Sequence, residues 1–127
     1  LVLVNRLAER TRLDSQPREN SDSVVYRVLG YINEHYNEDL SLDFLANKFF
    51  ISKYHLSREF KNYFGITPNH YVIAKRITMA KKLLRFSNLT IEEIASQCGF
   101  YDASYLNKQF RKSEGISTSD FKKKWIN

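Results

Sequence analysis

Cysteine, proline and glycine are scarce in this chain, and each scarcity narrows what the protein can be. Of the 127 residues, one is cysteine, two are proline and four are glycine, while 43% are hydrophobic. Few helix breakers beside so much apolar content are typical of a compact, largely helical domain. The single cysteine, Cys98, excludes an internal disulfide framework and fits a reducing cytoplasm.

Metal ligands and long apolar runs are also missing. The histidines show no ligand spacing with Cys98 or with one another, so the sequence predicts neither a metal site nor a cofactor. No apolar run approaches the roughly 20 residues of a membrane-spanning helix, and we expect no membrane partner. Residues 1–4 are too short for the apolar part of a signal peptide. Since the chain does not begin with methionine, we expect that it was cut from a longer protein.

Positive charge is in excess, and the sign of the charge alternates along the chain. The net charge is +6. Acidic residues predominate over 24–50 and 88–102, whereas basic residues predominate over 52–65, 69–86 and 103–127. Such alternation favours one face built for a polyanion, with nucleic acid as the first candidate. Ordinary solvated helix surfaces, where lysine is common, would give a similar pattern.

The most informative stretch is 52–65, because a second copy of it follows at 101–115. In each copy a leucine and a phenylalanine four residues apart fall on one helical face. The opposite face is polar in both copies: it carries Tyr54, Arg58 and Asn62 in the first, and Ser104, Lys108 and Lys112 in the second. Each copy ends in glycine, which readily adopts the left-handed conformation that closes a helix. We interpret the copies as two DNA-reading helices.

The region before the first copy divides into a linker and two helices. Residues 1–22 read as the tail of a preceding domain plus a linker, because 14–22 contain Pro17 and no apolar residue. From residue 23 the apolar spacing predicts a helix that ends near 37–39. Ser41 is the expected N-cap of a short helix over 42–49, and Phe50 and Ile51 make a tight corner before Ser52. Residues 41–65 thus form a helix-turn-helix unit.

A long helix over 68–86 is expected to join the two copies. Thr67 and Pro68 are a cap and a first-turn proline. The apolar stripe is Ile73, Ile77, Ala80 and Leu84, and the charge comes from Lys75, Arg76, Lys81, Lys82 and Arg85. At ~1.5 Å per residue the helix is roughly 28 Å long, of the order of one turn of B-DNA at ~34 Å. Such a connector can hold two reading helices in consecutive major-groove segments.

Beyond the connector the pattern of the first unit begins again over 90–115. Thr90 and Glu93 form a capping box, and the register matches the first unit except for one inserted residue between Phe100 and Leu106. A closing helix over 118–126 is expected to pack Phe121 and Trp125 on this second unit, and Cys98 to lie in its core. The predicted fold is all-α, with about seven helices in two helix-turn-helix units.

With this repeat in view, the chain resembles the DNA-binding domain of the AraC/XylS family of transcriptional regulators. The resemblance covers most of 24–125 and none of 1–20. It rests on I-A-S-Q-C-G-F at 94–100, S-Y-L-N-K-Q-F-R-K at 104–112, G-I-S at 115–117, Y-H-L-S-R-E-F-K at 54–61, and Arg76, Ala80, Leu83 and Leu84. One departure is Thr118, where the family usually carries proline, and we expect the last helix to start slightly differently.

The resemblance implies a transcription regulator, and not an enzyme, in the bacterial cytoplasm on the nucleoid. It would bind double-stranded promoter DNA and activate transcription by contacting RNA polymerase, possible targets being carbohydrate or other metabolic genes. Such domains usually follow a regulatory domain, so any dimerisation is expected through the missing preceding domain. An alternative is the output domain of a two-component response regulator.

The candidate contact residues lie on the outer faces of the two copies. Arg58 can donate two parallel hydrogen bonds to guanine, although a salt bridge to Glu59 is an alternative. Asn107 can pair with adenine or serve as a cap. The predicted base readers are Tyr54, His55, Ser57, Arg58, Ala103, Ser104, Asn107 and Lys108. The predicted phosphate contacts are Ser52, Lys53, Lys61, Asn62, Tyr105, Arg111 and Lys112.

Two other functions are weighed against this one. AraC-like helices also occur fused to DNA alkyl-repair enzymes, which need a reactive cysteine in a Pro-Cys-His type motif. Cys98 lies in Q-C-G-F, and that motif is absent. A helical protein–protein adaptor would not need two repeated basic faces.

Overall fold

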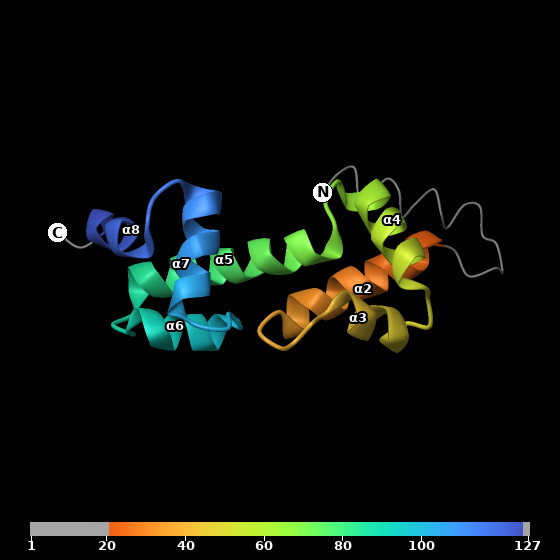
Figure 1. Ribbon diagram of the computed structural model, residues 1–127, viewed down its shortest axis with the longest axis horizontal. Coiled ribbons are helices and arrows are strands. Elements are labelled where there is room, and N and C mark those ends of the chain that lie inside the picture. Colours follow the sequence, from red (N-terminus) through yellow and green to blue (C-terminus); the bar gives the residue numbers. More distant parts are fainter. Residues whose placement is uncertain (1–20, 126–127) are drawn as a thin grey trace.

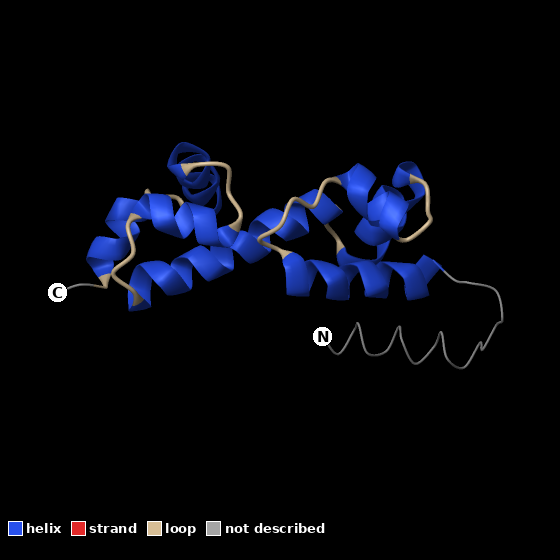
Figure 2. Ribbon diagram, turned by 90° about the horizontal axis from the view of Figure 1, so that it is seen from below, coloured by secondary structure: helices blue, strands red, loops and turns tan. Residues whose placement is uncertain are grey.

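The computed structural model describes residues 21–125. Seven helices and no strand make up this part of the chain, which confirms the all-α prediction (Figure 2). They are α2 (Ser21–His35), α3 (Leu42–Lys48), α4 (Lys53–Phe64), α5 (Pro68–Phe86), α6 (Ile91–Cys98), α7 (Ala103–Glu114) and α8 (Thr118–Lys124). The predicted tail and most of the linker, together with residue 126, lie outside the described residues. Within 21–125, no helix has the length and apolar character needed to cross a bilayer.

The long helix α5 joins two groups of helices, with α2, α3 and α4 around one end and α6, α7 and α8 around the other (Figure 1). Each group has its own apolar core, and α5 contributes to both. Val72 belongs to the first core, whereas Ile77, Ala80 and Leu84 belong to the second. The predicted stripe on α5 therefore serves mainly the second unit. Val72, which that stripe left out, anchors the helix to the first.

Local capping explains where the helices start and stop. The hydroxyls of Ser41, Ser52 and Thr67 accept hydrogen bonds from the backbone N–H groups of Phe44, His55 and His70, at 3.0, 3.1 and 3.2 Å. The predicted capping box of Thr90 and Glu93 is present in both directions, at 3.1 and 2.8 Å. Gly65 and Gly115 close α4 and α7 in the left-handed conformation, as predicted.

The corner between the two helices of each unit is also left-handed, but different residues form it. In the second unit the corner is Gly99 at φ 94°. In the first it is Phe50 at φ 56°, with 94% of its surface exposed. A bulky residue in this region is strained, and glycine is not. The predicted tight corner is therefore present, and the first unit carries a conformational cost that the second does not.

Several boundaries differ slightly from the predictions, among them the end of α2 at His35. α2 begins at Ser21, two residues early, and α3 ends at Lys48 with Phe49 as its C-cap. α8 ends at Lys124, so Trp125 is a C-cap with 49% of its surface exposed. The ring of Trp125 does contact Phe121, but it mainly lies under the guanidinium of Arg85, at 3.9 Å from the ring centre. Trp125 is thus less buried than predicted, whereas Phe121 is buried in the second core.

Candidate nucleic-acid interface

The outer faces of α4 and α7 are open to solvent, because their inner faces are fully used by the two cores. Leu56 and Phe60 of α4 are 0% exposed, as are Leu106 and Phe110 of α7. In Figure 1, α7 crosses α5 near one end, whereas α4 lies beside the other end. We call the outer face of α4 the first reading surface (Tyr54, His55, Ser57, Arg58). The outer face of α7 is the second (Ala103, Ser104, Asn107, Lys108).

The start of α4 presents an aromatic ring and a cation beside a neutral cap. Tyr54 is 75% exposed, so its ring does not pack in the core. The ammonium of Lys53 lies 5.8 Å from the Tyr54 ring centre and 3.4 Å from the carboxylate of Asp43 in α3. Exposed ion pairs of this kind contribute little stability, so Lys53 can exchange Asp43 for another anion at small cost.

Arg58 is held by two neighbours on its own helix. Its Nη2 lies 3.1 Å from Nδ1 of His55, and its Nε lies 3.6 Å from a carboxylate oxygen of Glu59. The predicted ion pair with Glu59 is thus present. The Arg58 side chain nevertheless stays 63% exposed, so these contacts orient the guanidinium without hiding it. His55 is half-buried and serves here as a support for Arg58.

The second reading surface has an acidic cap and an additional aromatic residue. A carboxylate oxygen of Asp102 accepts the Tyr105 N–H at 2.8 Å, where α4 uses Ser52. Beside it lies a hollow of about 390 Å³ lined by Tyr101, Asp102, Ser104, Tyr105 and Lys108. Tyr101 is 92% exposed and was absent from the predicted contact residues. The signal that identifies it is the inserted residue in the repeat, which is Tyr101 itself.

Asn107 uses its side-chain oxygen within the protein. Its Oδ1 accepts hydrogen bonds from the N–H of Thr118 at 3.2 Å and from the Thr118 hydroxyl at 2.7 Å. Thr118 is 0% exposed. The first of these bonds needs an N–H that proline lacks, so the departure from the family pattern changes how α8 is attached. Asn107 thus caps the start of α8, and its pairing with adenine stays a prediction.

The predicted phosphate contacts flank both surfaces. All except Tyr105 are exposed: they are Ser52, Lys53, Lys61, Asn62, Arg111 and Lys112. Tyr105 is half-buried, and its ring packs against Phe100 at 5.9 Å between centres. At the end of α7, Lys81 lies 3.1 Å from Glu114. Although burial raises the pKa of Glu114, the hydrogen bonds from Ser113 and Lys81 and the charge of Lys81 lower it overall.

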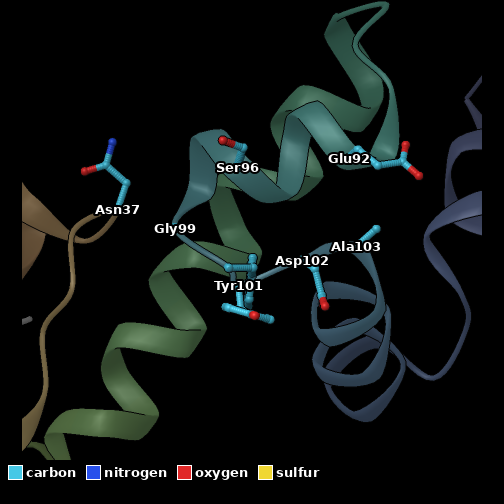
Figure 3. Close-up of a pocket in the computed structure, with 8 residues that line it drawn as sticks. Asn37, Glu92, Ser96, Gly99, Tyr101, Asp102 and Ala103 are labelled. Carbon is cyan, nitrogen blue, oxygen red and sulfur yellow. The ribbon is translucent and has the colours of Figure 1, made fainter.

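Elsewhere the described chain offers little catalytic chemistry. A hollow of about 470 Å³ lies between the loop after α2 and the start of α7 (Figure 3), and the polar side chains on its lining include Glu92, Ser96 and Asp102. Cys98 is 1% exposed, as the core prediction required, and burial raises the pKa of its thiol to about 11. No group of three potential metal ligands gathers anywhere in residues 21–125.

The fold and the paired polar helices define the class: a helical DNA-binding protein with two helix-turn-helix units. A family model described as a helix-turn-helix domain matches residues 45–124. The chain belongs to the AraC/XylS family of transcriptional regulators, and corresponds to its C-terminal DNA-binding domain.

Individual relatives agree. The transcriptional activator RhaS of Escherichia fergusonii is 31% identical over 104 residues, covering 82% of this chain and 37% of RhaS. The DNA-binding domain of AdpA, a global transcriptional factor, in complex with target DNA has a TM-score of 0.76 at 27% identity, covering 80% of this chain and 91% of that one. The C-terminal domain of AraT, a response regulator from Geobacillus stearothermophilus, has a TM-score of 0.79 at 30% identity, covering 82% and 87%. The chain therefore spans little more than a third of the length of the curated relatives it matches.

Proposed function

We propose that the protein is a sequence-specific transcription activator that inserts α4 and α7 into two successive major-groove segments of promoter DNA. The observation that carries this proposal is the repetition of one capped helix, with a polar, exposed outer face, at the two ends of a 19-residue connector. A helix N-terminus with exposed side chains is the part of a helix-turn-helix unit that reaches base edges. Activation is supported by the name of the relative RhaS, a transcriptional activator, and contact with RNA polymerase is part of the proposal.

The residue roles follow from exposure and chemistry. Arg58 reads a guanine with a bidentate pair, supported by His55 and Glu59, and Tyr54 packs on a thymine methyl. On α7, Ser104 and Lys108 read bases and Ala103 offers a methyl group. Asn107 acts as a positioning residue for α8. The flanking set contacts phosphates, which fix register without reading sequence: Ser52, Lys53, Lys61, Asn62, Tyr105, Arg111 and Lys112.

Binding across a range of salt concentrations tests the proposal directly. Sites selected from a random DNA pool are compared with scrambled DNA of the same length. Affinity for both should fall steeply with salt because phosphate contacts release counterions. The ratio between selected and scrambled DNA should stay at about a thousandfold or more. Equal affinity for both DNAs would reduce the protein to a non-specific binder.

A second candidate is the output domain of a two-component response regulator, favoured by the likeness to the domain of AraT. The two candidates share the same DNA chemistry and differ in what controls it. In the whole protein, phosphorylation of a receiver domain should raise DNA affinity if the second candidate holds. A response to a small effector alone would favour the first.

An enzymatic role finds no support in the site. A repair cysteine has to present a thiolate, whereas the thiol of Cys98 lies in the second core with a pKa near 11. That the protein is a non-enzymatic regulator stays a prediction and forms part of this proposal. The regulated genes, for which carbohydrate or other metabolic functions were expected, stay a prediction.

A further inference from the structure

A side chain of the connector ties it to the first helix-turn-helix unit, close to the corner of the second. Arg76 of α5 reaches back to the loop after α2, where its Nε donates to the carbonyl of Tyr36 and its Nη2 to the carbonyl of Glu38, both at 2.6 Å. The sequence indicated Arg76 as part of the connector's charge and as a match to the family pattern, but not its contact with this loop. Burial lowers the pKa of Arg76, and the two carbonyls offset the cost of placing a cation there.

The corner of the second unit lies against the same loop. A Cβ added at Gly99 would lie 2.7 Å from Cα and 2.9 Å from the carbonyl carbon of Asn37, and 3.0 Å from Nε of Arg76. Figure 3 shows Asn37, on the loop after α2, at the side of the hollow where Gly99 forms its corner. Only a residue without a side chain permits this approach. Loop, guanidinium and corner thus form one joint.

This joint helps to fix the orientation of the two units relative to each other, which their separate cores do not fix. The cores share no buried residue, and each unit packs on its own part of α5. The length of α5 fixes how far apart the units lie. Packing on α5 also restricts their relative rotation, and Arg76, the 36–38 loop and Gly99 add direct contacts that hold it.

We propose that Arg76 and Gly99 form an inter-unit lock that fixes the angle between α4 and α7 and thereby selects the spacing between the two halves of the DNA site. This inference rests on the proposed function. One added base pair turns a half-site by about one tenth of a helical turn. A protein with a fixed angle between α4 and α7 cannot follow that rotation, whereas a protein in which this angle varies can. Arg76 is therefore a positioning residue for spacing.

Binding to a spacing series tests the lock. The selected site is compared with versions carrying one or two base pairs more or fewer between its halves. For the unmodified chain, one added base pair should weaken binding by about a hundredfold, because the second helix no longer engages. Arg76→Met should bind the original spacing about tenfold more weakly, with less than about threefold difference among spacings. Lys82→Met, which removes an exposed charge from the same helix, is the matched control.

The pattern across spacings separates positioning from general stability. Lys82→Met should lower affinity by one common factor and keep the full dependence on spacing. Arg76→Lys keeps the charge, but an ammonium cannot bond to both carbonyls as the guanidinium does. Its dependence on spacing should therefore be weaker than that of the unmodified chain and stronger than that of Arg76→Met. If Arg76→Met keeps the steep dependence of the unmodified chain, the lock does not set spacing.

A distance measurement without DNA tests the same lock independently. Spin labels on Asn47→Cys in α3 and Gln97→Cys in α6 report the separation of the units by pulsed electron paramagnetic resonance. Both positions are exposed, whereas Cys98 is buried with a thiol pKa of about 11 and should stay unlabelled at neutral pH. We expect a narrow distribution in the unmodified background and a broad one with Arg76→Met.

Glycine variants provide a second matched pair. Gly99→Ala should shift or broaden the distribution, because its methyl group meets the Asn37 backbone. Gly115→Ala carries similar left-handed strain, at φ 84°, with open space around it, and should leave the distribution unchanged. Should Gly99→Ala fail to fold, the Arg76→Met distances decide. Narrow distances in Arg76→Met would overturn the lock, whereas loss of DNA specificity in the unmodified chain would overturn only the proposed function.

Discussion

The two helix-turn-helix units share one scaffold and differ where they face outward. Leu56 and Phe60 of the first unit and Leu106 and Phe110 of the second occupy equivalent buried positions, each 0% exposed. The exposed positions diverge: where α4 has Tyr54 and Arg58, α7 has Ser104 and Lys108. The comparison teaches that the core specifies a helix-turn-helix unit, and that its outer residues are exchanged without disturbing it.

The two units also differ in the charge of the N-cap residue and in the backbone strain of the corner before it. α4 begins with the neutral cap Ser52 after a strained corner at Phe50, whereas α7 begins with the anionic cap Asp102 after a relaxed corner at Gly99. A carboxylate at a helix N-terminus offsets the positive end of the helix dipole. The first unit is therefore better suited to receive a phosphate at its helix start. The second must place its positive charge further along α7.

Replacement of one core phenylalanine should give the largest effect, a loss of stability that differs between the two units. Phe60→Ala and Phe110→Ala should each cost about 3–5 kcal/mol, because each leaves a cavity in a closed core. Since the cores are separate, Phe60→Ala should lower amide hydrogen-exchange protection in residues 21–64, and Phe110→Ala in residues 91–121. Equal loss of protection throughout both units would show that they unfold as one body.

Arg58→Ala and Lys108→Ala should affect different halves of one DNA site. Each variant should lose about 1–3 kcal/mol of binding free energy, the value of one good base contact. Their footprints should lose protection over centres about 10 base pairs apart. Arg58→Lys should not restore binding, because an ammonium cannot make the bidentate pair. Loss of protection over the same bases in both variants would contradict two separate readers.

Exchange of the two caps should sharpen the electrostatic difference by a smaller amount. Asp102→Ser should raise DNA affinity about threefold to tenfold at low salt, since a carboxylate no longer opposes the phosphates. The slope of log affinity against log salt concentration should become steeper by about one. Ser52→Asp should do the reverse. Both residues still cap their helices, so thermal stability should change little. Titrations at several salt concentrations measure the effect, and an unchanged salt dependence would place both caps away from the phosphates.

The corner at Phe50 should give the smallest effect. Phe50→Gly should stabilise the protein by about 0.5–1 kcal/mol, because it relieves the left-handed strain and loses almost no burial. Tyr101→Gly is the control, since Tyr101 is 92% exposed but does not have a positive φ. Its replacement should be neutral or destabilising. Urea unfolding distinguishes the two, and equal changes would show that strain at Phe50 is not the cause.

Features governed by neighbours along the chain were predictable from the sequence. The caps at Ser41, Ser52, Thr67 and Thr90 and the glycine ends at Gly65 and Gly115 are set within a few residues. So is the division of α4 and α7 into a buried and an exposed face, because side chains four residues apart share one side of a helix. The resemblance to the AraC/XylS family was also visible in the sequence, on the motifs at 54–61, 94–100 and 104–112.

Tertiary structure alone decided how these pieces are held together. Asn107 is bonded to Thr118, 11 residues away, and Arg76 is bonded to carbonyls about 40 residues earlier. Periodicity places both residues on the outside of a helix, but it does not predict which distant segment of the chain contacts them. The sequence by itself thus determined two capped helices with polar faces. Only the folded chain assigned Val72 to one core and Ile77 to the other and turned Arg76 inward, since these depend on which loops meet in space.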